Sequence, residues 1–188
     1  MGKTTSKFLD VKMNVPLLFL ASILPDVDFV LGLQHRGPTH SVIVYSLVFV
    51  AAFFVFGKQA VPVLVSLVQH SLLGDLLTAG GVQVLWPVVS DWYGVQMPIL
   101  NVSNVIVEWA VFISAMALLL RTKDVMALFQ SHPYNLVLTV PVFAIVLPAF
   151  LSYPITIPVA LMIPHLVLLA LLVFSMMIDV KQILRFLH

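Results

Sequence analysis

The sequence of 188 residues is dominated by apolar side chains: 61% are hydrophobic and only 9% are charged, with a formal net charge of +1. Soluble domains carry roughly a quarter of charged residues, so this composition excludes an ordinary soluble protein and predicts an integral membrane protein. The chain contains no cysteine, which excludes disulfides, thiolate metal sites and cysteine nucleophiles. We expect the lipid bilayer as its surroundings and no nucleic acid as a partner.

Six apolar segments follow a short basic arm, residues 1–12, and each is expected to cross the bilayer as a helix of about 20 residues. The first segment is interpreted as an uncleaved signal anchor, because no small-residue cleavage site follows it. Residues 82–101 combine tryptophan, tyrosine and proline, a mixture typical of an aromatic belt at the interface. The segments are 15–24, 41–56, 60–77, 103–120, 136–151 and 157–178.

These segments predict an all-α, multi-pass transmembrane helix bundle that forms a single membrane domain over residues 1–188. Within it, residues 14–110 form the half that is expected to carry a metal site, and residues 111–188 add further transmembrane helices. Pro141, Pro148, Pro158 and Pro164 are expected to kink the last two helices without preventing a crossing. A short piece at residues 125–130 is expected to lie on the membrane surface.

The basic residues predict the orientation, because cytoplasmic loops of membrane proteins accumulate lysine and arginine. With the N-terminus inside, eight of the nine basic residues fall on the cytoplasmic side, and Arg36 alone lies outside. The eight are Lys3, Lys7, Lys12, Lys58, Arg121, Lys123, Lys181 and Arg185. We therefore predict a multi-pass protein of the plasma or inner membrane with both termini in the cytoplasm.

The same topology brings polar residues from four segments to one level near the outer face. An unpaired charge in the membrane costs about 2.5 to 3.5 kcal/mol on insertion scales, so these groups are expected to pair or to coordinate a metal. The residues predicted as metal ligands are Asp26, Asp28, His40, His70, Asp75 and Glu108. Imidazole and carboxylate together suit zinc, with manganese or iron as alternatives. A metal-free polar network with Arg36 is the competing interpretation.

Asp26 and Asp28 are two residues apart and would point about 200° apart on a regular helix. Pro25 disfavours helical geometry in the residue before it, so a non-helical turn is expected here, which would aim both carboxylates inward. Gly37 and Pro38 bend the following loop and leave His40 near the start of the second helix. His35, whose charge state changes near neutral pH, is a candidate for proton transfer.

Three stretches carry a resemblance to a known family. They are Leu-Pro-Asp-Val-Asp at 24–28, His-Arg-Gly-Pro-Thr-His-Ser at 35–41, and the run from His70 through Asp75 to Trp86-Pro87. Together they resemble a prokaryotic family of membrane-bound, metal-dependent hydrolases that is also described as LexA-binding and inner-membrane-associated. The resemblance covers residues 16–110 and implies a divalent metal site, related to those of zinc-dependent phospholipases and nucleases. Glu108 stands where that family tends to carry a glutamate.

The sequence departs from the family pattern at two points. The family carries a further histidine on an upstream helix, which the sequence from Met1 does not contain. The family also places its later histidine four residues before the aspartate, whereas His70 precedes Asp75 by five and Ser71 occupies the expected position. Five residues turn an α-helix to about 140° from the starting direction, so a π-bulge would be needed to bring both side chains onto one face.

Three functions remain open. The first is a hydrolase of a phosphoester or lipid-linked substrate, in which Arg36 holds a phosphate or other anion and His35 protonates the leaving group. The second is a non-catalytic accessory subunit of a larger membrane enzyme complex, which keeps the family fold with a degenerate site. The third, a transporter with proline-kinked helices, ranks last because the sequence has no internal repeat.

Overall fold

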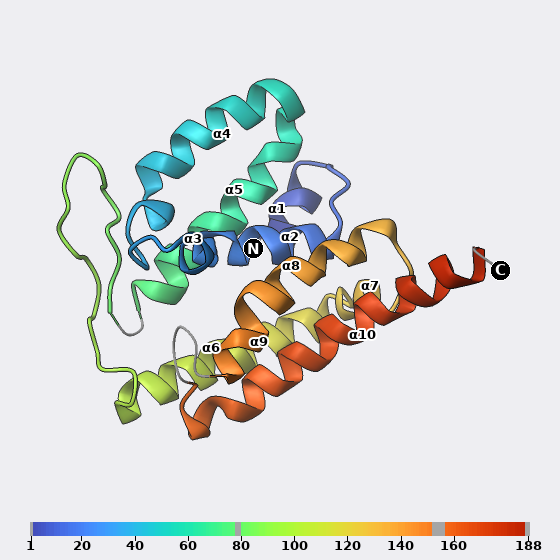
Figure 1. Cartoon of the computed structure of the whole chain (residues 1–188). Coiled ribbons are helices and arrows are strands. Elements are labelled where there is room, and N and C mark those ends of the chain that lie inside the picture. The colour runs from blue at the N-terminus through green and yellow to red at the C-terminus, as the bar shows by residue number, and fades with distance from the viewer. Residues whose placement is uncertain (1, 78–79, 152–156, 187–188) are drawn as a thin grey trace.

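The computed structural model describes residues 2–77, 80–151 and 157–186, and these residues are mostly helical (Figure 1). The β pairing among them is one isolated antiparallel bridge between Val82 and Tyr93. This architecture confirms the predicted all-α class. Residues 78–79, which follow the third predicted segment, and the side chains of Lys181 and Arg185 lie outside the described part of the chain.

The long helices follow the predicted apolar segments. They are α2 (Val15–Ile23), α4 (Val42–Phe56), α5 (Ala60–Gln69), α6 (Val102–Arg121) and α10 (Met162–Phe186). The fifth predicted segment is a chain of short helical pieces, η5 (Pro133–Leu138), α8 (Thr139–Pro141), η6 (Val142–Val146) and α9 (Leu147–Phe150). The remaining pieces are α1 (Gly2–Phe8), η1 (Leu24–Val27), α3 (Asp28–Leu31), η2 (Pro38–His40), η3 (Gly57–Gln59), η4 (His70–Asp75), α7 (Val125–Leu128) and η7 (Val159–Leu161).

Three stretches of the described chain are long and apolar enough to cross a membrane: Val42–Asp75, Val102–Arg121 and Val159–Val180. Val15–Val27 is also apolar but shorter. The first stretch folds back on itself, since α4 and α5 pack together as a hairpin around η3 (Figure 1). With 15 residues, α4 is about 22 Å long, less than the roughly 30 Å of a bilayer core. The number of six crossings and the cytoplasmic placement of both termini stay predictions.

The α4–α5 hairpin has clear local signals at both ends of α4. Ser41 caps its N-terminus by accepting hydrogen bonds from the backbone N–H groups of Ile43 and Val44. Gly57 ends it with a φ of 56°, a conformation that glycine adopts without the steric cost of a Cβ atom. Phe54 near the turn is 86% exposed, as expected for a helix face that meets lipid.

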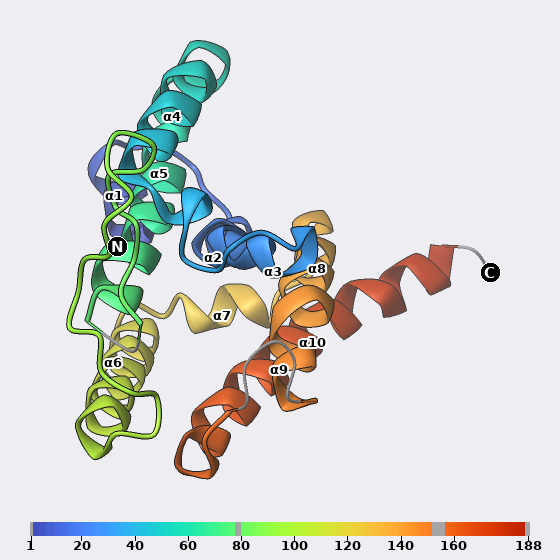
Figure 2. The same ribbon diagram turned by 60° about the vertical axis from the view of Figure 1, so that its left-hand side comes forward.

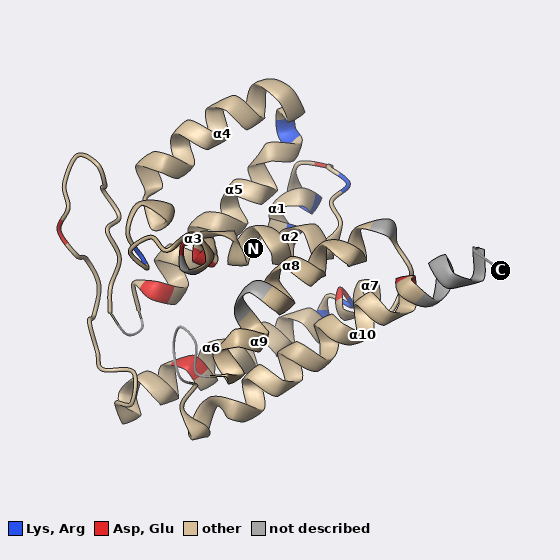
Figure 3. Ribbon diagram, viewed as in Figure 1, with Lys and Arg blue, Asp and Glu red and all other residues tan. Residues whose placement is uncertain are grey.

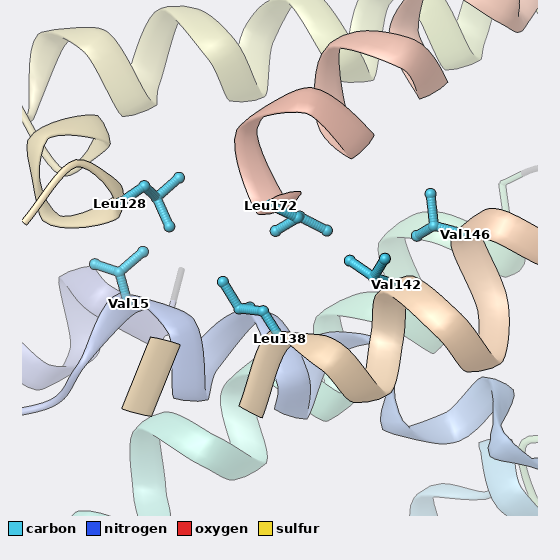
Figure 4. Close-up of a cluster of buried hydrophobic side chains, with 6 residues drawn as sticks. All are labelled: Val15, Leu128, Leu138, Val142, Val146 and Leu172. Carbon is cyan, nitrogen blue, oxygen red and sulfur yellow. The ribbon is translucent and has the colours of Figure 1, made fainter. Parts of the chain in front are cut away.

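One apolar cluster connects α2 with α7, η5, η6 and α10. Its buried members are Val15, Leu128, Leu138, Val142, Val146 and Leu172 (Figure 4). Figure 2 shows α1, α4, α5 and α6 on one side, α8, α9 and α10 on the other, and α2 with α7 between them. In a bilayer such clusters hold helices together through close packing rather than through transfer from water. The cluster therefore anchors α2, whose C-terminal end leads into the polar stretch.

Residues 80–101 form an extended loop (green in Figure 1). Its stem is closed by two backbone hydrogen bonds between Val82 and Tyr93, of 2.8 and 2.9 Å. The backbone N–H of Gln83 donates to the carbonyl of Arg36 at 3.0 Å, and that of Val42 donates to Val84 at 3.0 Å. The loop is thus tied to residues 36–42, which carry part of the predicted site.

Charged residues are few in the ribbon, and the two ends of the α4–α5 hairpin differ in sign (Figure 3). Lys58 lies in η3, the turn that joins α4 to α5, whereas Asp75 lies at the end of η4, which follows α5 at the far end of the hairpin from this turn. The acidic residues of the predicted site are therefore at the opposite end of the hairpin from its basic turn.

Candidate metal centre

Five of the predicted site residues converge in two overlapping groups that share His40. One group contains Asp26, His35 and His40, and the other contains His40, His70 and Asp75. Within each group, one potential ligand atom per residue lies within 4.8 Å of the others. The side chains come from η1, the loop before η2, η2 itself and η4, so the site depends on tertiary packing of segments far apart in the sequence.

Two imidazole nitrogens each lie close to the same two carboxylate oxygens. His40 Nε2 lies 3.4 Å from Asp26 Oδ1 and 3.2 Å from Asp75 Oδ2. His70 Nε2 lies 3.2 Å from the same Asp26 oxygen and 3.3 Å from the same Asp75 oxygen. A tetrahedral site with ligands about 2.0 Å from zinc has ligand separations of about 3.3 Å. These four nitrogen–oxygen separations therefore match those between the ligands of a small divalent ion.

Two buried polar atoms at the centre lack a hydrogen-bond partner among the described residues. They are His40 Nε2 and Asp75 Oδ2, which lie 3.2 Å apart without the alignment of a hydrogen bond. Buried polar atoms are rarely left unsatisfied, because desolvation without a partner is costly. A bound ion would satisfy both atoms, and nitrogen with oxygen is a ligand set that suits zinc, manganese or iron.

Asp28 is fully buried and lies behind the histidines, outside both ligand groups. Its Oδ2 accepts hydrogen bonds from the Thr39 hydroxyl at 2.9 Å and from the backbone N–H of Arg36 at 3.0 Å. Its carboxylate is also 3.1 Å from His35 Nδ1 and 3.5 Å from His40 Nδ1. Metal-binding histidines commonly direct their second ring nitrogen to a carboxylate, which fixes the ring. The structure thus places Asp28 to orient histidines, although the sequence suggests a direct ligand.

The non-helical turn expected after α2 does not form. Leu24, the residue before Pro25, keeps helical geometry with a φ of −55° and a ψ of −32°, and the chain tightens into the 3-10 turn η1 before α3 begins at Asp28. Asp26 consequently reaches the Nε2 edge of His40, while Asp28 reaches its Nδ1 edge. Both carboxylates point inward, as predicted, but they serve opposite sides of one imidazole ring.

The five-residue spacing of His70 and Asp75 is accommodated by a π-helix. The segment η4 spans His70–Asp75, and the backbone N–H of Leu76 donates to the carbonyl of Ser71, five residues earlier, at 3.0 Å. One extra residue per turn brings the first and last side chains of the segment back to the same face. The π-bulge that the spacing requires therefore exists, and it restores the pair that the family pattern produces with a spacing of four.

Arg36 belongs to the wall of the site. Its Nη2 lies 2.9 Å from Asp75 Oδ1, and 16% of its side chain is exposed. Its backbone adopts a φ of 61° and binds both Asp28 and Gln83. The sequence suggests Arg36 as a holder of a substrate anion, and the structure gives it Asp75 as an immediate partner.

Glu108 does not join the cluster. It lies on α6, where its Oε1 accepts a hydrogen bond from Asn104 Nδ2 at 2.9 Å. Sequence reasoning also missed two supporting contacts. Thr39 holds Asp28 and could have been noticed inside the 35–41 motif, whereas the 2.7 Å contact between the Tyr45 and Ser71 hydroxyls has no local sequence signal.

The protonation of His40 reflects two opposing effects. Burial lowers its pKa, but the nearby carboxylates of Asp26 and Asp75 outweigh burial and raise the pKa to about 9. Without an ion, this imidazole is therefore protonated at neutral pH. A metal that binds here has to displace that proton, as is general for histidine ligands.

Comparison with known proteins gives one match. The family model described as YdjM inner membrane protein matches residues 1–179, well past the end of the resemblance at residue 110. Neither the curated proteins nor the solved structures yield a match. Because the family model covers nearly the whole chain and the described helices include stretches that can span a bilayer, the chain belongs to the YdjM inner membrane protein family and is an integral protein of the inner membrane.

Proposed function

We propose that this protein is a membrane-embedded, metal-dependent hydrolase of a phosphoester in a lipid or lipid-linked substrate. The observation that carries the proposal is the arrangement of four atoms in which Nε2 of His40 and of His70 each lie 3.2 to 3.4 Å from a carboxylate oxygen of Asp26 and of Asp75. A divalent ion held by these residues, zinc in the first place, would supply Lewis acidity and a water of lowered pKa when bound.

His35 is the residue we assign to proton transfer. Asp28 fixes its ring through the 3.1 Å contact at Nδ1, and 22% of the side chain is exposed, so protons can exchange with solvent. An imidazole can bind and release a proton and is suited to protonate a leaving group. His35 also lies within ligand range of Asp26 and His40, and the experiment below separates the two roles.

Arg36 contributes positive charge beside the site. Its guanidinium group is paired with Asp75, a member of the ligand set, and is partly exposed. A cation in this position favours the approach of an anionic headgroup such as a phosphate, and the planar guanidinium group suits phosphate oxygens.

The surroundings of the site favour a lipid substrate. The elements that carry the ligands also expose large apolar side chains: Leu24 on η1, Leu31 on α3 and Leu73 on η4 are 45%, 62% and 44% exposed. Ligand sites for apolar molecules combine such surfaces with a few placed polar groups. A substrate with acyl or prenyl chains could therefore reach the polar cluster from within the bilayer.

The test is to purify the protein in detergent, measure its metal content by mass spectrometry, and assay phosphoester-containing lipids. We expect bound metal and turnover in the wild type, loss of both in Asp75→Asn, and loss of turnover with retained metal in His35→Ala. Asp91→Asn, in an exposed loop position, is the matched control and should change neither. Absence of metal from all preparations would refute the proposal. Bound metal without turnover of any lipid tested would support the accessory-subunit alternative instead.

A further inference from the structure

A second set of buried polar side chains lies at the other end of α2 from the histidine cluster. It consists of Asn135 on η5 and of Ser175 and Asp179 on α10, which are 0%, 0% and 4% exposed. The neighbouring apolar cluster, which includes Val15 at the start of α2, separates this set from the candidate metal centre. No role in the proposed hydrolysis uses these three residues.

The helices η5 and α10 pack against each other, and their register places the three residues on the sides that face one another. Leu138 of η5 and Leu172 of α10 belong to one buried cluster and lie side by side in Figure 4. In a 3-10 helix, residues three apart share a face, so Asn135 lies on the face of Leu138. On α10, Ser175 and Asp179 follow Leu172 on one face, three and seven residues later. Asn135 therefore lies opposite the Ser175–Asp179 edge of α10.

Hydrogen bonds from the loop before η5 fix the orientation of two of these groups. Oδ1 of Asp179 accepts from the Ser131 hydroxyl and from the backbone N–H of His132, the latter at 2.9 Å. The backbone N–H of Asn135 donates to the His132 carbonyl at 2.8 Å, and its Nδ2 donates to the Gln130 carbonyl at 2.8 Å. Because Asn135 Nδ2 donates this hydrogen bond, the other polar atom of the side chain is Oδ1, which can only accept a hydrogen bond or bind a cation.

Three buried oxygens of this set have no hydrogen-bond partner in the part of the chain that the structure describes: Asp179 Oδ2, Asn135 Oδ1 and Ser175 Oγ. Two of them are acceptors only, so a donor or a cation is what the set lacks. An uncompensated carboxylate in an apolar helix interface is costly, and such residues in membrane proteins are paired or bind ions.

We propose that Asp179, Asn135 and Ser175 bind a small monovalent cation, sodium, between η5 and α10. Hard cations take oxygen ligands such as carboxylate, amide carbonyl and hydroxyl oxygens, and the set contains no imidazole that would favour zinc. One positive charge balances the single carboxylate, whereas a divalent ion would leave a buried excess of charge. The ion would fasten α10 to the loop at residues 130–135.

The test measures thermal unfolding of the purified full-length protein, with zinc held constant, as sodium chloride replaces choline chloride at fixed ionic strength. Binding to the folded state raises the unfolding midpoint in a saturable way. We expect this rise in the wild type and in Asp91→Asn, no rise in Asp179→Asn, and an apparent sodium dissociation constant about 10-fold or more higher in Ser175→Ala. Ser175→Ala keeps the loop contacts of Asp179 and covers the case in which Asp179→Asn does not fold.

Isothermal titration of the wild type with sodium chloride provides the direct measurement. A midpoint that is equal in sodium and choline would overturn the proposal. So would a sodium response that both variants retain, or a response to magnesium or calcium in place of sodium. Because thermal unfolding and calorimetric titration do not use lipid hydrolysis, their results do not depend on the proposed enzyme activity.

Discussion

The substitution Asp28→Asn tests whether a buried carboxylate orients the histidines without binding the ion. Asp28 Oδ2 accepts from the Thr39 hydroxyl and from the backbone N–H of Arg36, and the carboxylate also contacts His35. An amide replaces one acceptor oxygen by a donor, so at least one of these donors loses its partner at a cost of about 1 to 3 kcal/mol. Converted at 1.4 kcal/mol per tenfold, this corresponds to roughly a 5- to 150-fold loss in metal affinity.

That range overlaps the loss of about 10- to 100-fold that is typical when a residue supporting metal ligands is changed. The assay is titration of metal-stripped protein with zinc in detergent, with Asp91→Asn as the control. We expect Asp28→Asn to reach the wild-type stoichiometry at high zinc but with weaker affinity, whereas Asp75→Asn should lose stoichiometry. Wild-type affinity in Asp28→Asn would refute the orienting role, and complete loss of binding would make Asp28 a direct ligand.

Three further outcomes follow from the contacts. Deleting Ser71 should convert the π-helix η4 into an α-helix with a spacing of four between His70 and the aspartate. Zinc titration of this variant should give an affinity within about tenfold of the wild type. Inserting an alanine at the same place should abolish zinc binding. Tyr45→Phe removes the buried 2.7 Å contact with Ser71 and should lower stability in chemical unfolding by about 0.5 to 1.5 kcal/mol, with Tyr134→Phe at an exposed position as the control. Leu172→Ala creates a cavity in the apolar cluster around α2 and should lower the free energy of unfolding by about 2 to 5 kcal/mol in the same measurement. Leu166, at an exposed position on α10, is the control, and a smaller loss in Leu172→Ala than in Leu166→Ala would contradict the assigned core.

The sequence was sufficient to locate the long helices, because runs of apolar residues between polar or glycine-containing breaks determine where a membrane helix can form. The predicted topology likewise placed Asp26, His40, His70 and Asp75 at one level, and the five-residue spacing of His70 and Asp75 showed that a π-bulge would be needed to bring them onto one face. The helix positions and this spacing are local features, so the order of residues along the chain contains the necessary information.

The roles of other site residues depend on contacts between distant segments. Asp28 lies outside both ligand groups and instead accepts hydrogen bonds from the Thr39 hydroxyl and the Arg36 backbone. The Arg36 side chain pairs with Asp75, and the Arg36 backbone carbonyl accepts a hydrogen bond from Gln83 in the extended loop. Glu108, at an equally polar position in the sequence, finds Asn104 on its own helix instead of the cluster. Neither the hydropathy pattern nor the spacing of residues in the sequence specifies these contact partners.

The most direct test of the candidate metal centre is the metal content of the protein purified in detergent, compared with that of a His40→Ala, Asp75→Asn double variant. His40 belongs to both ligand groups and Asp75 carries a central oxygen without a hydrogen bond. We predict about one equivalent of zinc, or of manganese or iron, in the wild type and none in the variant. Equal metal content in the two proteins, or no metal in the wild type, would contradict the account.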